Sequence, residues 1–403
     1  MRYNILKKIL VLVIIALLFE VNLQYGISAN NQSPFSNYRN DIINSNEDEF
    51  DEKIMFYMQQ GHMPSISTCI IKNDSVLWSK GYGLSNINKG IKATDKTIYL
   101  IASITKTITA TAIMQLWEQG LFDLDDDVND YLPFSLRNPK YPDIPITFRM
   151  LLAHHSSLSD SYLILGFYFT VLKLPIEYIE QLLVPGGKLY RSVFWTDEPP
   201  GEQLVYSSIG YEVLGYLVEL LSGKKLDEYC KEFIFDPLEM HNTSFDRSYF
   251  ELKDIARPYI WIFNRTFIPV VHYNLKNSAS GGIRTSVIDL SHFLIANMNG
   301  GVYKNNRILE EETVQLIRTR QYPDNDSTNR YTYGLGWRIS VRYNTNSFGH
   351  SGGLPGVLTF MYYYLENQTG IIFFTNQYPI LEYKDIWSFL NILMLLIEKS
   401  DDL

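Results

Sequence analysis

Strand-like runs lie near both ends of this 403-residue chain, and most of the stretch between them has a helical pattern. Two early runs of apolar and β-branched residues, 66–72 and 76–83, flank Asn73-Asp74, which is typical of a hairpin. Four later runs have the same character, at residues 336–341, 345–349, 357–364 and 370–375. This order predicts one antiparallel sheet built from both ends of the chain, with a mostly helical subdomain inserted between them.

Helical periodicity covers much of the remaining sequence. The expected helices lie at residues 50–60, 103–120, 147–154, 176–183, 209–221, 226–235, 287–297, 310–319 and 386–397. The last of these is shorter than the ~20 residues that a helix needs to cross a bilayer. We therefore expect it to pack on the sheet.

The composition supports a large globular core, because 46% of the residues are hydrophobic. The net charge is −9 and no dense basic stripe is visible, so no nucleic-acid partner is expected. His154-His155 are adjacent rather than spaced as in a metal-binding helix, so we expect them to be structural, with no metal or cofactor. Cys69 and Cys230 lie in apolar runs and are expected to be buried free thiols.

The amino terminus has the pattern of an export signal. Arg2, Lys7 and Lys8 form a basic region ahead of an unbroken apolar run over residues 9–19. We expect a signal peptide or an uncleaved anchor over residues 1–29, a disordered lead-in over 30–49, and a globular domain over 50–403. The protein is therefore expected to be exported, extracellular or periplasmic, and to reach a membrane only through an uncleaved amino-terminal segment.

Ser103-Ile104-Thr105-Lys106 stands at the head of the helical run that ends at Gly120. A serine and a lysine three residues apart project from the same face of a helix. The lysine amine can then accept the proton of the serine hydroxyl, which is a weak nucleophile by itself. A second match, Ser222-Gly223-Lys224-Lys225, follows an apolar run and is typical of a helix carboxyl terminus instead.

Two later motifs accompany Ser103 and Lys106. Tyr206-Ser207-Ser208 follows the turn-forming residues 198–201 and precedes a helix, and His350-Ser351-Gly352-Gly353 lies in a glycine-rich segment between two strand-like runs. Three further short motifs accompany these, at residues 151–158, 280–283 and 334–337. From about residue 50 onward the chain resembles the serine β-lactamase and penicillin-binding-protein superfamily, whose pattern is S-x-x-K, Y-x-N and then K-T-G or H-x-G. Within it, the chain is similar to the branch of class C β-lactamases, D-aminopeptidases and family VIII esterases.

The resemblance implies an α/β fold of the β-lactamase/transpeptidase type, with an antiparallel sheet flanked by helices. It assigns Ser103 as the nucleophile, Lys106 as the proton acceptor and Tyr206 as a member of the proton relay. It assigns Ser208 and the residues of the later motif to substrate binding: His350, Ser351, Gly352 and Gly353. The backbone N–H of Gly353 is expected to form an oxyanion hole with that of Ser103.

Two positions depart from the lactamase pattern. Ser208 stands where the family usually has asparagine, so the amide that binds a substrate amide is missing. His350 replaces the lysine of K-T-G, and histidine need not carry a charge at pH 7. The first change weakens the expected binding of the side-chain amide of a β-lactam and the second that of its carboxylate; the second is shared with esterase and aminopeptidase members.

The sequence therefore predicts an exported serine hydrolase that acts through an acyl-enzyme on a small ester or on a peptide or amide. The alternative is a catalytically weak relative that serves as a binding or scaffold protein, which could be tethered to a membrane. The Ser208 departure favours the alternative, whereas Ser103, Lys106 and Tyr206 favour the hydrolase. The identity of the substrate and the oligomeric state stay open.

Overall fold

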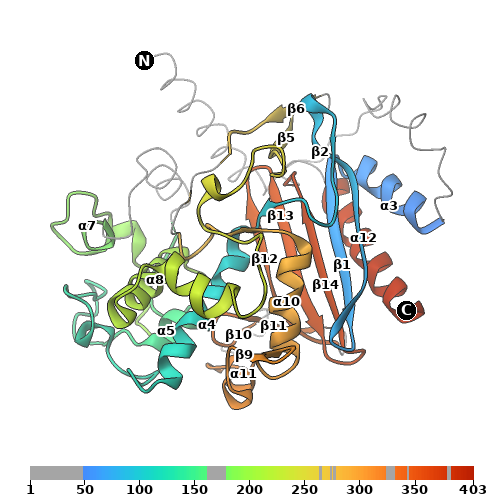
Figure 1. Ribbon diagram of the computed structural model, residues 1–403. Coiled ribbons are helices and arrows are strands. Elements are labelled where there is room, and N and C mark those ends of the chain that lie inside the picture. The colour runs from blue at the N-terminus through green and yellow to red at the C-terminus, as the bar shows by residue number, and fades with distance from the viewer. Residues whose placement is uncertain are drawn as a thin grey trace.

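The computed structural model describes residues 49–160, 178–262, 266–272, 275, 278–323, 332–342, 345–378 and 383–403. Its main feature is an eight-stranded antiparallel sheet in the order β10-β11-β12-β13-β14-β1-β2-β3 (Figure 1). The strands are β1 (Ser65–Lys72), β2 (Ser75–Asn86), β3 (Ile91–Lys92), β10 (Thr332–Tyr333), β11 (Arg338–Arg342), β12 (Thr345–Leu354), β13 (Val357–Tyr364) and β14 (Thr369–Thr375). The expected signal or anchor and nearly all of the expected lead-in lie outside the described residues.

The two ends of the chain meet inside this sheet. Strand β1 pairs with β2 on one side and with β14 on the other, with Cys69 opposite Ile372. Every residue of β14 and all but the last of β1 are buried. Central strands buried on both faces need helices on both sides of the sheet. The predicted assembly of one antiparallel sheet from both chain ends is confirmed.

Helices cover both faces of the sheet (Figure 1). On one face, α3 (Glu49–Gln60) and α12 (Tyr383–Asp402) pack Ile54 and Ile392 in one apolar cluster with Ile70 of β1. On the opposite face, α10 (Val287–Met298) belongs to the larger cluster that contains Cys69 and Ile372. The prediction that the carboxyl-terminal helix packs on the sheet is therefore correct, and the helix is longer than expected.

The inserted helical region surrounds α4 (Thr105–Glu118), in which twelve consecutive residues from Thr105 are buried. The α4 helix packs on α8 (Ser208–Ser222), and α5 (Phe148–Leu152) packs on α8 as well (Figure 1). The remaining α-helices among the described residues are α7 (Ile179–Leu183), α9 (Leu226–Cys230) and α11 (Glu311–Ile317). Burial on all sides makes α4 a rigid support for the residues at its amino terminus.

Three details differ from the predicted elements. The run 226–235 is α9 followed by one π-helical turn, η9 (Lys231–Phe235). Strand β12 does not end at Gly349 but continues through the glycine-rich motif, because β13 pairs with it as far as Leu354 opposite Val357. Short two-stranded sheets also form between segments without a strand pattern: β4 (Tyr99–Leu100) with β7 (Arg284–Thr285), β5 (Tyr259–Ile262) with β6 (Thr266–Pro269), and β8 (Val302–Tyr303) with β9 (Asn306–Arg307).

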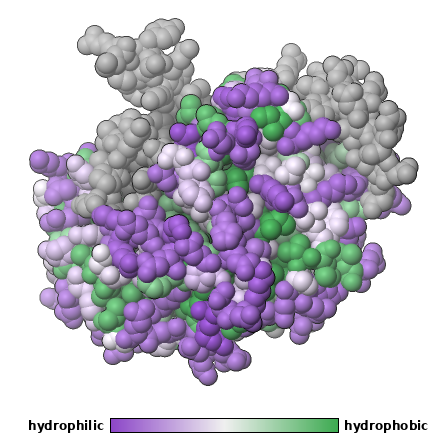
Figure 2. All heavy atoms as spheres, in the orientation of Figure 1, coloured by the Kyte–Doolittle hydropathy of each residue, from purple (hydrophilic) through white to green (hydrophobic). Residues whose placement is uncertain are grey.

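Cys69 and Cys230 are both buried and unbridged, as predicted. Burial raises the pKa of both thiols above the ordinary range, so neither is a reactive thiolate. None of the helices in the described ranges is both long enough and apolar enough to span a bilayer. The face seen in Figure 2 is largely hydrophilic, and its hydrophobic residues lie in separate areas.

Candidate active site

Ser103 lies in the turn that enters α4. This turn, η4 (Ala102–Ile104), is a short 3-10 helix, so the α-helix begins two residues after the serine rather than at it. Ala102 has φ = +46°, in the left-handed region that favours glycine. Its neighbour Ile101 is held from two sides, because its N–H donates to Ile283 O (2.9 Å) and its carbonyl accepts from Thr359 Oγ1 (2.8 Å). Strained backbone persists where surrounding contacts hold it in place.

Lys106 is completely buried and its amine lies at the centre of the site. Its Nζ donates to Ser103 Oγ at 3.2 Å, to Ser208 Oγ at 3.2 Å and to the carbonyl of Ser280 at 2.9 Å. Three acceptors match the three N–H donors of an ammonium group. The amine is therefore held in one position, with one of its hydrogen bonds on the hydroxyl of Ser103.

Burial lowers the pKa of Lys106 to about 8, while the carboxylates of Asp160 and Glu212 act in the opposite direction. Desolvation disfavours the charged amine more than these two carboxylates favour it. An amine with this pKa has a useful neutral fraction near pH 7 and can accept a proton. This property does not follow from the sequence motif, because it depends on the enclosure of the amine by distant segments.

Tyr206 and Ser208 reach the site at the start of α8. Ser207 caps this helix, and its hydroxyl accepts from the N–H of Gly210. The aromatic ring of Tyr206 lies beneath the amine, with its centroid 4.9 Å from Lys106 Nζ. The structure thus brings together Ser103, Lys106, Tyr206 and Ser208 from the amino-terminal ends of two helices that are about a hundred residues apart in sequence.

His350 lies on β12 beside these groups, and its side chain is buried. Its Nδ1 lies 2.7 Å from the carbonyl of Ser351, and its ring centroid is 6.1 Å from that of Tyr206. Burial, reinforced by the nearby charge of Lys106, lowers the pKa of His350 to about 3. The imidazole is therefore neutral at pH 7 and provides no cation for a substrate carboxylate.

The glycines after His350 allow close approach of the backbone. A Cβ on Gly352 would lie 2.3 Å from Ile101 O and 3.0 Å from Ser103 N, and a Cβ on Gly353 would lie 2.4 Å from the ring of Tyr378. Strand β12 therefore runs directly against the turn that carries Ser103. A larger residue at Gly352 would push these two segments apart.

Two carboxylates of the site carried no sequence motif. Asp160 accepts from the N–H groups of Ser208 and Ile209, and Glu212 accepts from the N–H and hydroxyl of Ser280. Burial raises the pKa of both carboxyl groups. The available sequence indication was the position of Asp160 two residues after the 151–158 motif.

The two histidines predicted to be structural lie beside the site. His154 Nδ1 accepts a hydrogen bond from the N–H of Ser207 at 3.1 Å, and its ring centroid is 4.5 Å from that of Tyr206. Burial lowers the pKa of His154 well below its ordinary value, so the ring is neutral. His155 stacks on Tyr322 at 4.0 Å. His154 therefore supports the segment that carries Tyr206.

The second serine–lysine match forms no such arrangement. Ser222 ends α8, and its hydroxyl donates to the carbonyl of Val218. Gly223 adopts φ = +70° and terminates the helix, and Lys225 pairs with Glu219. This part of the chain is a helix carboxyl terminus, as predicted.

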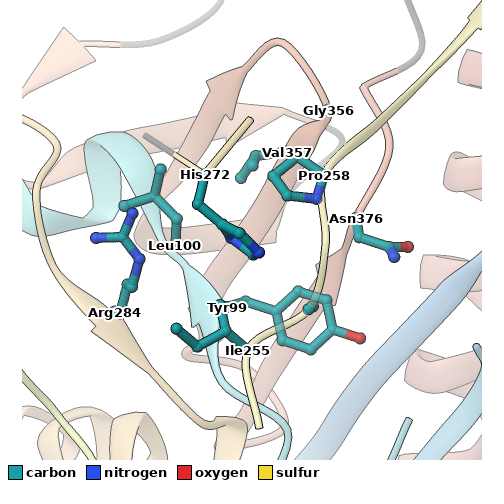
Figure 3. A pocket seen from close by; sticks show the side chains of 10 residues that line it. Tyr99, Leu100, Ile255, Pro258, His272, Arg284, Gly356, Val357 and Asn376 are labelled. Atoms are coloured by element: carbon teal, nitrogen blue, oxygen red, sulfur yellow. The ribbon is translucent and has the colours of Figure 1, made fainter. Parts of the chain in front are cut away.

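A separate small pocket lies near the loop between β12 and β13 (Figure 3). Tyr99, Leu100, His272, Arg284 and Gly356 are among its lining residues, and none of the predicted site residues is. The space open to a water molecule is about 10 Å³, enough for a single water. Within the described ranges, no group of three or more His, Cys, Asp or Glu side chains could hold a metal ion.

Comparisons with known proteins agree with this architecture. Residues 50–388 match the family model described as Beta-lactamase. The curated Protein flp of Staphylococcus aureus (strain N315) is 27% identical over 336 residues, which cover 83% of this chain and 64% of flp. The Putative penicillin-binding protein PbpX of Bacillus subtilis (strain 168) is 26% identical over 325 residues, or 81% of this chain and 73% of PbpX. The match with flp thus spans slightly less than two thirds of that protein.

Solved structures show the same fold. The octameric penicillin-binding protein homologue from Pyrococcus abyssi has 28% identity and a TM-score of 0.74, over 87% of this chain and 77% of the other. The D-amino acid amidase from Ochrobactrum anthropi SV3 has 19% identity and a TM-score of 0.67, over 87% of this chain and 99% of the other. At that identity, the second likeness concerns the fold alone.

Proposed function

The chain belongs to the beta-lactamase family, and from this premise we propose that it is a serine hydrolase that forms an acyl-enzyme on Ser103. One observation carries the proposal: the amine of Lys106, wholly buried and with a lowered pKa, lies 3.2 Å from Ser103 Oγ. A nucleophile in hydrogen-bond contact with a base whose pKa is close to the working pH is the arrangement that covalent catalysis needs.

In the acylation step, the hydroxyl proton of Ser103 moves to the neutral amine of Lys106 while Oγ bonds to the substrate carbonyl carbon. The carbonyl electron pair moves to oxygen, where the backbone N–H groups of Ser103 and Gly353 stabilise the charge. The ester or amide bond then breaks, and the leaving group takes the proton from Lys106. This leaves an acyl ester on Ser103.

In the second step, water attacks the acyl ester, and Tyr206 takes the proton of the water while its own hydroxyl proton moves to the neutral amine of Lys106. The bond to Ser103 breaks, the acid leaves, and the proton returns from Lys106 to Oγ. The ring of Tyr206 lies 4.9 Å from Lys106 Nζ, beside the amine that holds the proton.

The proposed substrate is a small ester or a peptide or amide, including one with a D-residue. The neutral, buried His350 supports an uncharged substrate over one with a carboxylate, because no fixed cation is available on β12 at this position. The proposed location is outside the cytoplasm, which is supported only by the basic and apolar pattern of residues 2–19.

Labelling by a fluorophosphonate probe tests the nucleophile. We expect the wild-type protein to bind the probe at Ser103, and a panel of p-nitrophenyl esters, D-amino-acid amides and nitrocefin to identify the substrate class. Ser103→Ala should abolish labelling and turnover, whereas the control Ser222→Ala should retain both. Full turnover by a folded Ser103→Ala protein would refute the proposal.

A further inference from the structure

Asp160 provides a negative charge at the site, and its carboxylate faces the first turn of α8. Both of its oxygens accept the N–H of Ser208 at 2.7 Å, and one accepts the N–H of Ile209 at 3.1 Å. These bonds satisfy donors that are free at a helix amino terminus. They also fix the position of Ser208 relative to the carboxylate.

Ser208 connects this carboxylate to the amine of Lys106. Its Oγ accepts a hydrogen bond from Lys106 Nζ at 3.2 Å, and its backbone N–H donates to both carboxylate oxygens of Asp160 at 2.7 Å. Ser208 is therefore engaged on both sides, by its hydroxyl and by its backbone N–H.

We infer that Asp160, acting through Ser208, is a positioning residue that holds the amine of Lys106 on Ser103. The inference rests on the proposed function, because it concerns the base of that reaction. It differs from the sequence-based interpretation, in which Ser208 is a substrate-binding residue. In the structure, Ser208 joins the two charged groups: its hydroxyl accepts from the amine of Lys106, and its backbone N–H donates to the carboxylate of Asp160.

Other titratable groups face Lys106 from every neighbouring element. They are Tyr206, Tyr211 and Glu212 on and just before α8, His154 after α5, and His350 on β12. Both histidines are neutral because burial depresses their pKa values. Glu212 is negative when ionised, but its oxygens are occupied by Ser278, Ala279 and Ser280. Each carboxylate is linked to Lys106 through one serine: Glu212 through Ser280, whose carbonyl accepts from the amine, and Asp160 through Ser208, whose hydroxyl accepts from it.

Removing the charge of Asp160 should lower the pKa of Lys106 further. Two negative charges oppose the effect of burial, and that of Asp160 acts more strongly than that of Glu212. The test compares Asp160→Asn with the wild type in the pH dependence of fluorophosphonate labelling and of kcat/KM for an uncharged ester. The amide of this variant would retain one oxygen that can accept from the α8 backbone.

We expect the acidic limb of both profiles to move to lower pH by roughly 0.5–1 unit, and the plateau to fall about tenfold or more as the amine loses its orientation. Ser208→Ala should move the limb in the same direction, and the double variant should move it no further than Asp160→Asn alone. Such non-additivity is the sign of one connected chain. If Asp160→Asn does not fold, Ser208→Ala tests the inference by itself. This variant retains the hydrogen bonds from the α8 backbone to the Asp160 carboxylate.

Asp289→Asn is the matched control, because Asp289 is also a buried carboxylate that accepts a backbone N–H, from Asn242, but it lies on α10 away from Lys106. This variant should reduce the stability of the fold without shifting the acidic limb of either pH profile. An unmoved limb in folded Asp160→Asn and Ser208→Ala proteins, with an active wild type, refutes the inference and leaves the proposed function intact. A wild-type protein that is not labelled on Ser103 overturns both.

Discussion

The pH dependence of the wild-type reaction follows from the buried amine of Lys106. Its pKa of about 8 lies below the ordinary lysine value because burial disfavours the charged form. Only the neutral amine can accept the proton of Ser103, so activity increases as pH rises through this pKa. About a tenth of the amine is neutral at pH 7 and about a hundredth at pH 6.

We therefore expect kcat/KM to rise about tenfold between pH 6 and pH 7, about fivefold between pH 7 and pH 8, and about twofold more by pH 9. The assay is a pH-stat titration of an uncharged aliphatic ester, whose own ionisation does not contribute. Because kcat/KM reports the free enzyme, the limb measures Lys106 before substrate binds.

A limb centred near pH 6.5 would refute this reasoning, because it would indicate a histidine base with an ordinary pKa. The two histidines beside the site cannot produce such a limb. Burial places the pKa of His350 at about 3 and that of His154 well below its usual value. Ser222→Ala is the control and should give the wild-type profile.

Further predictions concern the motif, substrate charge, the amino terminus and metals. Lys106→Ala should abolish ester turnover with the fold retained, as judged by circular dichroism; substantial residual turnover would exclude Lys106 as the base. Wild-type kcat/KM should be orders of magnitude greater for esters than for nitrocefin. The double variant His350→Lys with Ser208→Asn should reduce the ratio of the two kcat/KM values. The recovered charged contact contributes roughly 1.5–3 kcal/mol, or about ten- to a hundredfold. Equal wild-type kcat/KM values for esters and nitrocefin would contradict the roles given to these two positions. Amino-terminal sequencing of the native protein should begin shortly after residue 25, whereas an intact Met1 in a soluble cytoplasmic fraction would refute export. A metal chelator should leave the rate unchanged, and a loss that zinc restores would reveal a metal site.

Local patterns in the sequence predicted most of the elements and the central pair of the site. The spacing of Ser103 and Lys106 is a property of one helix entry, so it is visible without knowledge of the fold. Likewise, Thr147 is expected to start a short helix, and its hydroxyl accepts from the N–H of Met150. Strand runs at both chain ends were also sufficient to predict one sheet from both ends.

The strand order and the environment of Lys106 depend on contacts between distant segments. Asp160 accepts hydrogen bonds from a helix that begins 48 residues later, and the carbonyl of Ser280 accepts one from the amine of Lys106, 174 residues earlier. A lone aspartate in a loop has no local feature that identifies its partner. Strand β12 extends through Gly353 only because β13 lies beside it, which the glycine-rich sequence does not reveal.

The sequence by itself thus determined which side chains are available for the chemistry: a serine, a lysine and a tyrosine in an ordered set of motifs. The tertiary structure decided their properties. The amine of Lys106 has a pKa of about 8 because α4 is enclosed by packing, and His350 is neutral because β12 is buried against the turn that carries Ser103. Desolvation depends on everything that surrounds a group, and that surrounding exists only after the chain has folded.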